Sequence, residues 1–236
     1  MTDLLFHNHS YLREFDATVT GVAETGVALD RTAFYIGGGG QPSDVGILTA
    51  DGREYGVTGV KRGGGLLVHL IEGDRPSEGN RVSGKIDWER RYRLMRTHTA
   101  LHILCGVVWR DFGALVTGGN MQPGEARMDF ELERMTADFA DEIEEKINAE
   151  VAAARSVLAA NLPREEAEQI PDLIRTKINL LPANIREVRT IDIQGLDVQA
   201  DGGTHVDNTI EVGRIRVVGH ESKGRINKRL RIALEE

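Results

Sequence analysis

The pattern of apolar residues changes once along the chain, at Asp87, and this change constrains the fold more than any other feature. Before it, residues 14–86 consist of short apolar runs of strand length, separated by glycine, aspartate and proline. Such runs at regular spacing are typical of antiparallel strands joined by turns. We therefore predict a small β-barrel or β-sandwich in this part of the chain.

Directly after the change, apolar residues recur with helical spacing from Arg90 to Phe112, and Gly113 follows as a helix stop. The helices and strands predicted after this point make the remainder of the chain a mixed module. The sequence therefore predicts an α+β fold with two domains, a β-barrel domain at 1–86 and an α+β domain with an antiparallel sheet and packed helices at 87–236.

Within the second domain, the order of elements follows from local patterns. The segment "VTGGNMQPGEARMDFEL" is expected to be a loop that leads into a strand. A long amphipathic helix is expected from Thr136 to about Ala160, with Asp138 in its first turn, where negative charge is favourable. The remaining elements are a short helix in "LPREEAEQIP", a strand in "IREVRTIDI", and two closing antiparallel strands in "TIEVGRIRVVGHES" and "KRLRIALE".

Composition excludes several classes of protein. The 236 residues include one cysteine, Cys105, so an intramolecular disulfide is impossible and a reducing cytoplasm is the expected location. No run approaches the roughly 18–20 apolar residues of a membrane span, and we expect no membrane partner. The net charge of −8 is unevenly distributed, because acidic residues dominate between Glu131 and Glu150 whereas Lys and Arg dominate between Arg214 and Arg231.

The stretch "RTHTALHIL" places His98 and His102 four residues apart in the first predicted helix, so both imidazoles lie on one face. Leu94, Leu101 and Cys105 share that face, which makes it the buried one. Buried imidazoles need partners, because an unpaired polar group in a core costs a few kcal/mol. By itself the pair is more typical of structural histidines than of metal ligands.

A second pair of candidate metal ligands, in "DVQADGGTHVDN", makes a metal site more plausible than the histidine pair alone does. Asp201 and His205 are also four residues apart, but Gly202 and Gly203 between them exclude a helix. One interpretation is a turn closed by the aspartate side chain, with an incidental histidine. The other is that this bent loop and the helical histidines enclose one ion, since imidazole and carboxylate together suit zinc.

The segment "TAFYIGGGGQPSDVG" contains four consecutive glycines, which let backbone N–H groups approach a partner closely. It lacks the lysine and hydroxyl residue of a Walker loop, so it does not indicate a nucleotide site. A flexible hairpin is the plain alternative. Hydrogen-bonding side chains flank the run, however, and the candidate substrate-binding residues of the chain are Thr32, Gly38, Gly39, Gly40, Gln41, Asp44 and Asn120.

The motifs "TAFYIGGGGQPSDVG", "MRTHTALHIL", "ARMDF" and "GGTHVDNTIEVG" occur in the order found in the editing region of alanyl-tRNA synthetase. The chain resembles the free-standing AlaX trans-editing proteins, in the medium-length form that carries the glycine-rich module. The resemblance extends from about Thr18 to Leu234. It implies a β-barrel followed by an α+β editing domain, and a metal-dependent deacylase acting on Ser-tRNA(Ala) and possibly on Gly-tRNA(Ala).

The resemblance also implies a Zn²⁺ ion held by His98, His102 and His205. The family usually has a cysteine as the fourth ligand, where this chain has Asp201. Exchanging thiolate for carboxylate replaces a soft ligand with a hard one and weakens zinc selectivity. Direct ligation by Asp201, ligation through a water, and loss of the fourth ligand all remain open.

For the substrate, a site built to hydrogen-bond the serine hydroxyl would leave its polar groups unpaired behind alanine. Thr32 is the candidate reader of that hydroxyl, with Gln41 in support, and the three histidines are the candidate catalytic residues. The partner is then the acceptor end of tRNA(Ala) carrying a wrong amino acid. Two alternatives remain: a metal-free tRNA-binding module that has lost catalysis, and a metal-dependent hydrolase of small esters.

Basic residues near the C-terminus can follow an RNA backbone, although a solvated edge strand protected by charge explains them equally well. Arginines at the start of the first helix are expected to extend the same surface: Arg90, Arg91, Arg93 and Arg96. The C-terminal candidates for RNA binding are Lys223, Arg225, Lys228 and Arg229.

Overall fold

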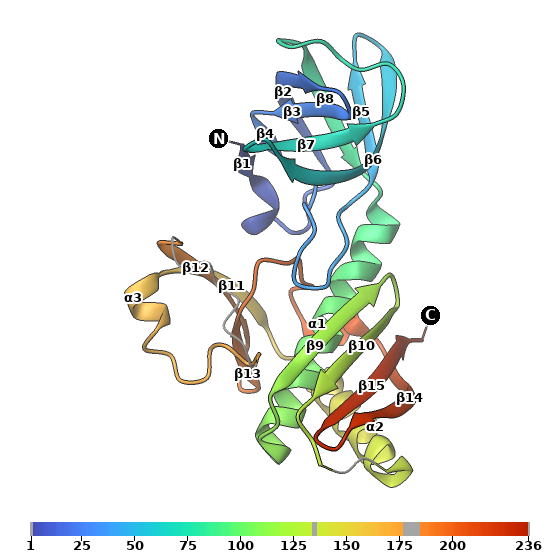
Figure 1. Ribbon diagram of the computed structural model, residues 1–236, viewed down its shortest axis with the longest axis vertical. Coiled ribbons are helices and arrows are strands. Elements are labelled where there is room, and N and C mark those ends of the chain that lie inside the picture. The colour runs from blue at the N-terminus through green and yellow to red at the C-terminus, as the bar shows by residue number, and fades with distance from the viewer. Residues whose placement is uncertain (1, 134–135, 177–184, 236) are drawn as a thin grey trace. The chain divides into compact units, whose positions relative to one another are not determined.

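A computed structural model describes residues 2–133, 136–176 and 185–235 (Figure 1). The chain divides into two compact units, Met1–Tyr92 and Arg93–Glu236. The division falls within helix α1 (Trp88–Phe112), six residues after the predicted boundary between 86 and 87. Among the described residues, none of the helices combines the length and the apolar character needed to cross a membrane.

The first unit is built around a closed six-stranded antiparallel barrel, which confirms the β-barrel prediction (Figure 1). Strand β8 completes the closure, because it pairs with β2 on one side and with β5 on the other. Around the barrel the strands run in the order β2 (Glu14–Ala23), β3 (Gly26–Leu29), β7 (Leu66–Ile71), β6 (Arg53–Gly63), β5 (Gly46–Ala50) and β8 (Arg81–Ile86).

Alternating burial along these strands forms the barrel core. In β8 every second residue is buried, and in β2 the inward side chains include Phe15. A Cβ at Gly84 would lie 2.4 Å from the Phe15 ring, so this position accommodates only glycine. Outside the barrel, β1 (Asp3–Leu4) pairs in parallel with β4 (Arg31–Thr32).

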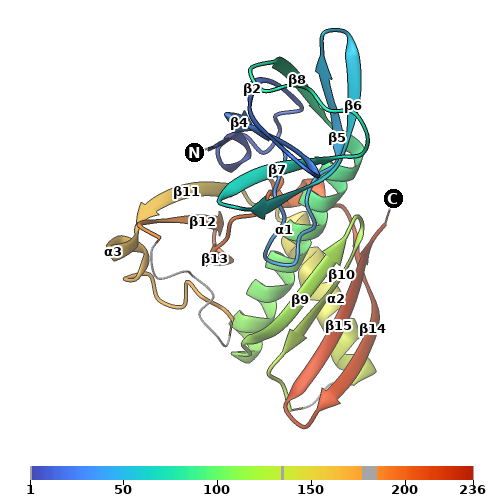
Figure 2. The same ribbon diagram turned by 45° about the horizontal axis from the view of Figure 1, so that its top comes forward.

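The described residues of the second unit form two antiparallel sheets, accompanied by α-helices (Figure 2). One sheet has the order β14 (Ile215–Gly224), β15 (Asn227–Leu234), β10 (Glu125–Phe130), β9 (Val116–Gln122). The other has the order β11 (Val157–Pro163), β12 (Glu187–Ile193), β13 (Asp197–Ala200). The helices are α1, α2 (Ala137–Ala152) and α3 (Arg164–Ala167).

Most predicted elements are confirmed. Helix α1 ends at Phe112, and Gly113 then adopts φ 62°, as expected of a helix stop. Thr136 caps α2, because its hydroxyl accepts a hydrogen bond from the N–H of Phe139 at 3.3 Å. The short helix in "LPREEAEQIP" is α3.

Three predictions of element boundaries were wrong. Helix α2 ends at Ala152 rather than near Ala160, because Ala154 takes φ 49° and the chain then pairs with β12 as β11. The segment 116–122 is a strand and not a loop, since pairing with β10 overrides its glycine-rich sequence. The residues Thr209–Val212, expected to begin a strand, form a 3₁₀ turn.

Candidate metal centre

Helix α1 supplies the first half of the site. His98 and His102 are 4% and 6% exposed, and Leu94, Leu101 and Cys105 on the same face are also buried. This confirms the predicted buried stripe. Burial raises the pKa of the Cys105 thiol far above its ordinary value, with Asp197 contributing in the same direction. The thiol is therefore inert, and Cys105 is a core residue.

The loop that follows β13 supplies the second half. Asp201 Oδ1 accepts a hydrogen bond from the N–H of Gly203 at 2.6 Å, which is the side-chain-closed turn that the sequence allowed. The same oxygen lies 3.1 Å from Nε2 of His205. The turn and the ligand pair are thus one structure, because the turn brings the carboxylate and the imidazole together.

The two halves converge. One ligand atom from each of His98, His102, Asp201 and His205 lies within 4.8 Å of all the others. The second oxygen of Asp201, Oδ2, lies 3.6 Å from Nε2 of His98 and 4.0 Å from Nε2 of His102. The histidine ring centroids are separated by 4.2–5.1 Å.

The electrostatics of this cluster favour a cation. Burial lowers the pKa of all three histidines, that of His102 to about 4, because an imidazolium ion loses its hydration in the interior. Burial alone would raise the pKa of Asp201, but His98 and the hydrogen bond to His205 hold it well below its usual range. Near neutral pH the cluster is therefore three neutral imidazoles and one carboxylate.

This donor set fits a divalent metal. Neutral imidazoles offer lone pairs, and the single carboxylate balances part of the charge of a bound ion. In addition, Nδ1 of His102 is buried without a hydrogen-bond partner among the described residues. A polar atom left in this condition is uncommon in a folded protein.

Arg189 fixes the backbone of the ligand loop. From β12, its Nη1 donates hydrogen bonds to the carbonyl oxygens of Asp201, at 3.0 Å, and of Gly203, at 2.8 Å. These carbonyls lie on either side of Gly202, so the guanidinium holds both ends of the bend. The side chain is almost fully buried, and its positive charge contributes to the lowered pKa of His98.

The glycine run belongs to the first unit and forms an ordered tight loop. Gly37, Gly38, Gly39 and Gly40 all have positive φ, between 57° and 142°, which L side chains rarely adopt. Gly38 and Gln41 exchange backbone hydrogen bonds at 3.0 and 2.9 Å, and Gln41 is buried. These bonds give the loop one defined conformation.

Thr32, also in the first unit, has no exposed surface. Its hydroxyl lies 2.8 Å from Nε2 of His69 and accepts the N–H of Phe34 at 3.1 Å. Nδ1 of His69 faces the carbonyl oxygen of Val27 at 3.3 Å and must carry the proton, because a carbonyl oxygen only accepts. Thr32 therefore donates its hydroxyl proton to His69.

Asp44, expected to bind substrate, is buried within the first unit. Its carboxylate binds Nε and Nη2 of Arg91 and accepts the N–H of Tyr35 at 2.6 Å. Arg91 was expected on a basic surface, and this expectation was wrong, because its side chain is fully buried. Arg96 donates to the carbonyl oxygen of Val212.

Comparison with known proteins identifies the chain. It is 41% identical over 233 residues to the alanyl-tRNA editing protein AlaX-M of Saccharolobus solfataricus, covering 98% of each chain. It is 38% identical over 241 residues to the AlaX-M protein of Methanosarcina barkeri, covering 99% of each. The chain belongs to the AlaX-M family.

The chain is also similar to one part of larger enzymes, the alanine–tRNA ligases. An alanine–tRNA ligase from Ignicoccus hospitalis is 39% identical over 223 residues, which are 92% of this AlaX-M chain and 24% of the ligase. A family model described as "tRNA synthetases class II (A)" matches residues 6–90. A second, described as "Threonyl and Alanyl tRNA synthetase second additional domain", matches residues 188–231.

Of the four C-terminal basic candidates in this AlaX-M chain, Lys228 and Arg229 are the more strongly engaged within the sheet. Lys228 is 4% exposed and donates to the carbonyl oxygens of Gly224 and Arg225, at 2.6 and 2.9 Å. Arg229 pairs with Asp129 through two hydrogen bonds. Lys223, near the end of β14, is exposed and its Nζ donates to Oε1 of Glu221 at 3.3 Å, whereas Arg225 is exposed in the turn that follows. RNA binding by these four basic residues stays a prediction, as does substrate binding by Asn120, which is exposed on β9.

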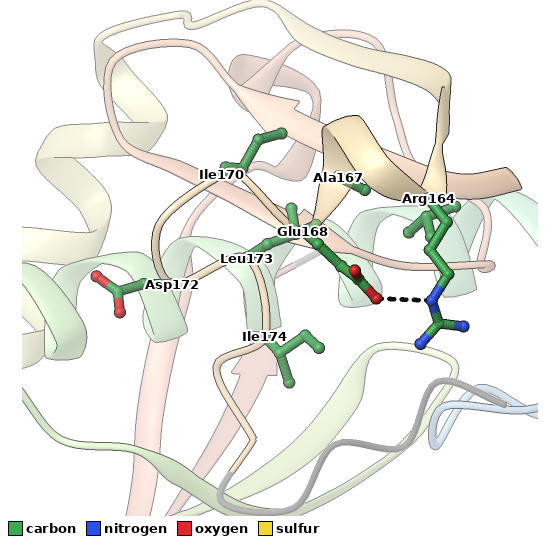
Figure 3. Close-up of a pocket in the computed structure, with 8 residues that line it drawn as sticks. Arg164, Ala167, Glu168, Ile170, Asp172, Leu173 and Ile174 are labelled. Atoms are coloured by element: carbon green, nitrogen blue, oxygen red, sulfur yellow. Dashed lines mark hydrogen bonds and ion pairs between the residues drawn. The ribbon is translucent and has the colours of Figure 1, made fainter. Parts of the chain in front are cut away.

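The second unit also contains a cavity of about 330 Å³ beside α3 (Figure 3). Its apolar wall includes Ala167, Ile170 and Leu173, and an ion pair between Arg164 and Glu168 lies at its side. The cavity contains none of the predicted site residues.

Two residues in contact with the candidate metal centre were missed from sequence. Arg189, which bonds the ligand loop, had no distinguishing pattern. Thr99, whose Oγ1 lies 3.2 Å from Nδ1 of His205, had one signal, its position between the two helical histidines.

Proposed function

We propose that this chain hydrolyses the ester of Ser-tRNA(Ala), and of Gly-tRNA(Ala) where it occurs, and so removes a wrong amino acid from tRNA(Ala). The convergence of His98, His102, Asp201 and His205 is the observation that carries the proposal. Family membership supports it, because the AlaX-M relatives are named alanyl-tRNA editing proteins. The alanine–tRNA ligases matched over the same segments support tRNA(Ala) as the partner.

The four converging residues would hold a Zn²⁺ ion. When bound, zinc supplies Lewis-acid chemistry, polarising an ester carbonyl or lowering the pKa of a water molecule. The chain's own contribution is the arrangement of ligands. Neutral histidines keep their lone pairs available, the single carboxylate of Asp201 balances charge, and Arg189 keeps the loop backbone in place. Burial keeps bulk water away from these groups.

Thr32 is the proposed reader of the serine hydroxyl. Because its proton is donated to His69 and one lone pair accepts the N–H of Phe34, one lone pair remains on its oxygen. A serine hydroxyl would donate to this lone pair, whereas alanine offers only a methyl group. Thr32 has no exposed surface, so this contact requires the residues that cover it to shift when substrate binds.

The test compares substrates on one preparation. We expect Ser-tRNA(Ala) to be deacylated on the order of 10⁴-fold faster than Ala-tRNA(Ala), the discrimination that a site built to hydrogen-bond a substrate hydroxyl provides. Equal hydrolysis of both, or of neither, would remove the serine-editing proposal. Adding Gly-tRNA(Ala) to the comparison tests the second substrate.

Metal analysis separates the enzyme from its alternative. One competing function is that of a metal-free tRNA-binding module. The presence of Asp201, at the position where a cysteine thiolate is expected in the family, favours this alternative. Stoichiometric zinc in the purified protein, and loss of deacylation in His102→Ala but not in His220→Ala, support the enzyme. His220 is an exposed histidine of β14 and serves as the matched control. Little metal together with no deacylation supports the binding module.

A further inference from the structure

One hydroxyl group on α1 connects the helix to the ligand loop. Thr99 has no exposed surface, and its Oγ1 accepts the backbone N–H of Val206 at 3.3 Å. The same oxygen lies 3.2 Å from Nδ1 of His205. Thr99 is adjacent to His98 in sequence, so a single turn of α1 carries one ligand and contacts another.

His205 needs such a contact more than the other histidines do. His98 and His102 are fixed by the hydrogen-bonded backbone of a 25-residue helix. His205 lies in the loop that follows β13, which contains Gly202 and Gly203 and has no regular secondary structure at His205. Arg189 donates hydrogen bonds to the carbonyl oxygens of Asp201 and Gly203, and these bonds fix the backbone of the loop rather than the imidazole. The ring orientation must therefore be set by groups that contact the imidazole itself.

The imidazole of His205 is held between two partners. Nε2 faces Asp201 Oδ1 at 3.1 Å, on the side where the four ligand atoms converge, and Nδ1 faces Thr99. If Nε2 offers its lone pair to a cation, the ring proton must reside on Nδ1, which then donates to Thr99 Oγ1. A hydroxyl suits this position, because it accepts from Nδ1 in this form and can donate to Nδ1 in the other.

We propose that Thr99 is a positioning residue for the metal centre: its hydroxyl orients the His205 ring and thereby sets the affinity for a divalent cation. This inference rests on the metal site of the proposed function. It concerns neither the choice of substrate nor the identity of the RNA. Partners of this kind, one shell beyond a ligand, typically change metal affinity by about 10–100-fold when they are removed.

The experiment uses Thr99→Val, which keeps the side-chain shape and removes the hydroxyl. Metal-free protein is titrated with Co²⁺, whose visible absorption reports ligand geometry, and zinc affinity is then measured by competition with a chelator. We expect Thr99→Val to bind Zn²⁺ about 10–100-fold more weakly and to show an altered Co²⁺ spectrum. Thr99→Ser keeps a hydroxyl at this position, so its zinc affinity should lie within about threefold of the wild-type value and its Co²⁺ spectrum should match that of the wild type.

Thr97→Val is the matched control. Thr97 is buried on the same helix, and its Oγ1 donates to the carbonyl oxygen of Arg93 at 2.7 Å and accepts the N–H of Gly124 at 2.9 Å. Both valine variants therefore leave one backbone N–H without its partner. If burial of that N–H were the whole effect, the two variants would lose stability and metal affinity alike.

Three outcomes would overturn the proposal. They are zinc binding by Thr99→Val that equals the wild type, equal losses in Thr99→Val and Thr97→Val, and failure of Thr99→Ser to recover the affinity. If Thr99→Val does not fold, Thr99→Ala takes its place, with folding checked by circular dichroism before titration. Absence of Co²⁺ and Zn²⁺ binding by the wild type would overturn the metal site itself, and is recognised before any variant is compared.

Discussion

Replacing Arg91 with methionine should unfold the first unit under conditions in which the wild type is stable. The guanidinium is fully buried and binds both carboxylate oxygens of Asp44, which is 1% exposed. It also donates to the carbonyl oxygens of Ala33, at 2.7 Å, and of Ser10, at 3.0 Å. Methionine fills much of the volume but leaves the carboxylate and both carbonyl groups without these donors.

The magnitude follows from these contacts. Removing one partner of a buried ion pair costs about 3–5 kcal/mol, because the remaining charge is left without compensation. The two carbonyl groups add to this, although such costs do not sum when the groups share one side chain. Since small domains are stable by about 5–15 kcal/mol in total, we expect the free energy of unfolding to fall by at least about a fifth.

The assay is urea unfolding followed by tryptophan fluorescence in a Trp109→Phe background. Trp88 then reports on the first unit alone, because it is the other tryptophan of the chain and precedes Tyr92. With a slope of about 1–2 kcal/mol per molar urea for a domain of this size, the midpoint should fall by roughly 1.5 M or more.

Arg90→Met is the control, since Arg90 is half-buried and its Nη1 donates to the carbonyl oxygen of Ser43, at 2.8 Å. We expect it to cost about 0.5–1.5 kcal/mol. Asp44→Asn added to Arg91→Met should recover part of the loss, because it removes the uncompensated charge. If Arg91→Met differs from Arg90→Met by less than about 1 kcal/mol, the reasoning from the buried ion pair is refuted.

Three further predictions concern other parts of the molecule. Burial lowers the pKa of His69 from 6.5 to about 4, so between pH 6.5 and pH 4 the unfolded state binds a proton at this histidine and the folded state does not. The free energy of unfolding of the first unit should therefore fall as the pH falls through this range, by up to about 3 kcal/mol. Urea midpoints across that range should vary less in His69→Gln, and an unchanged pH dependence would contradict the assignment. Asp201→Cys should keep or raise zinc affinity, since thiolate is the softer ligand; a loss measured by chelator competition would mean that the carboxylate geometry cannot be exchanged. Gly106→Ala on α1 should cost about 1–3 kcal/mol in thermal or urea unfolding, because its Cβ would lie 2.9 Å from Cβ of Asp197 and 3.0 Å from Cγ of Leu196. Gly119→Ala, whose nearest contact is at 3.7 Å, should change stability little, and equal effects would exclude overpacking as the cause.

The sequence was sufficient for features that depend on neighbouring residues. Short apolar runs separated by turn residues predicted the barrel strands, and helical spacing predicted α1 with both histidines on its buried face. Gly202 and Gly203 excluded a helix and left the bend that joins Asp201 to His205. These predictions held because backbone sterics and side-chain periodicity act over a few residues.

Only the tertiary structure decided which distant groups those elements meet. Arg91 lies in a run of basic residues that is typical of a surface, yet its partner Asp44 is 47 positions away and draws it into the interior. The hydroxyl of Thr99 meets His205 across 106 positions. Likewise, residues 116–122 become a strand because β10 pairs with them, although their own sequence is typical of a loop. Local pattern determines which face of an element is buried, whereas the partner of a buried charge or hydroxyl is determined by chain segments that pack together only in the folded protein.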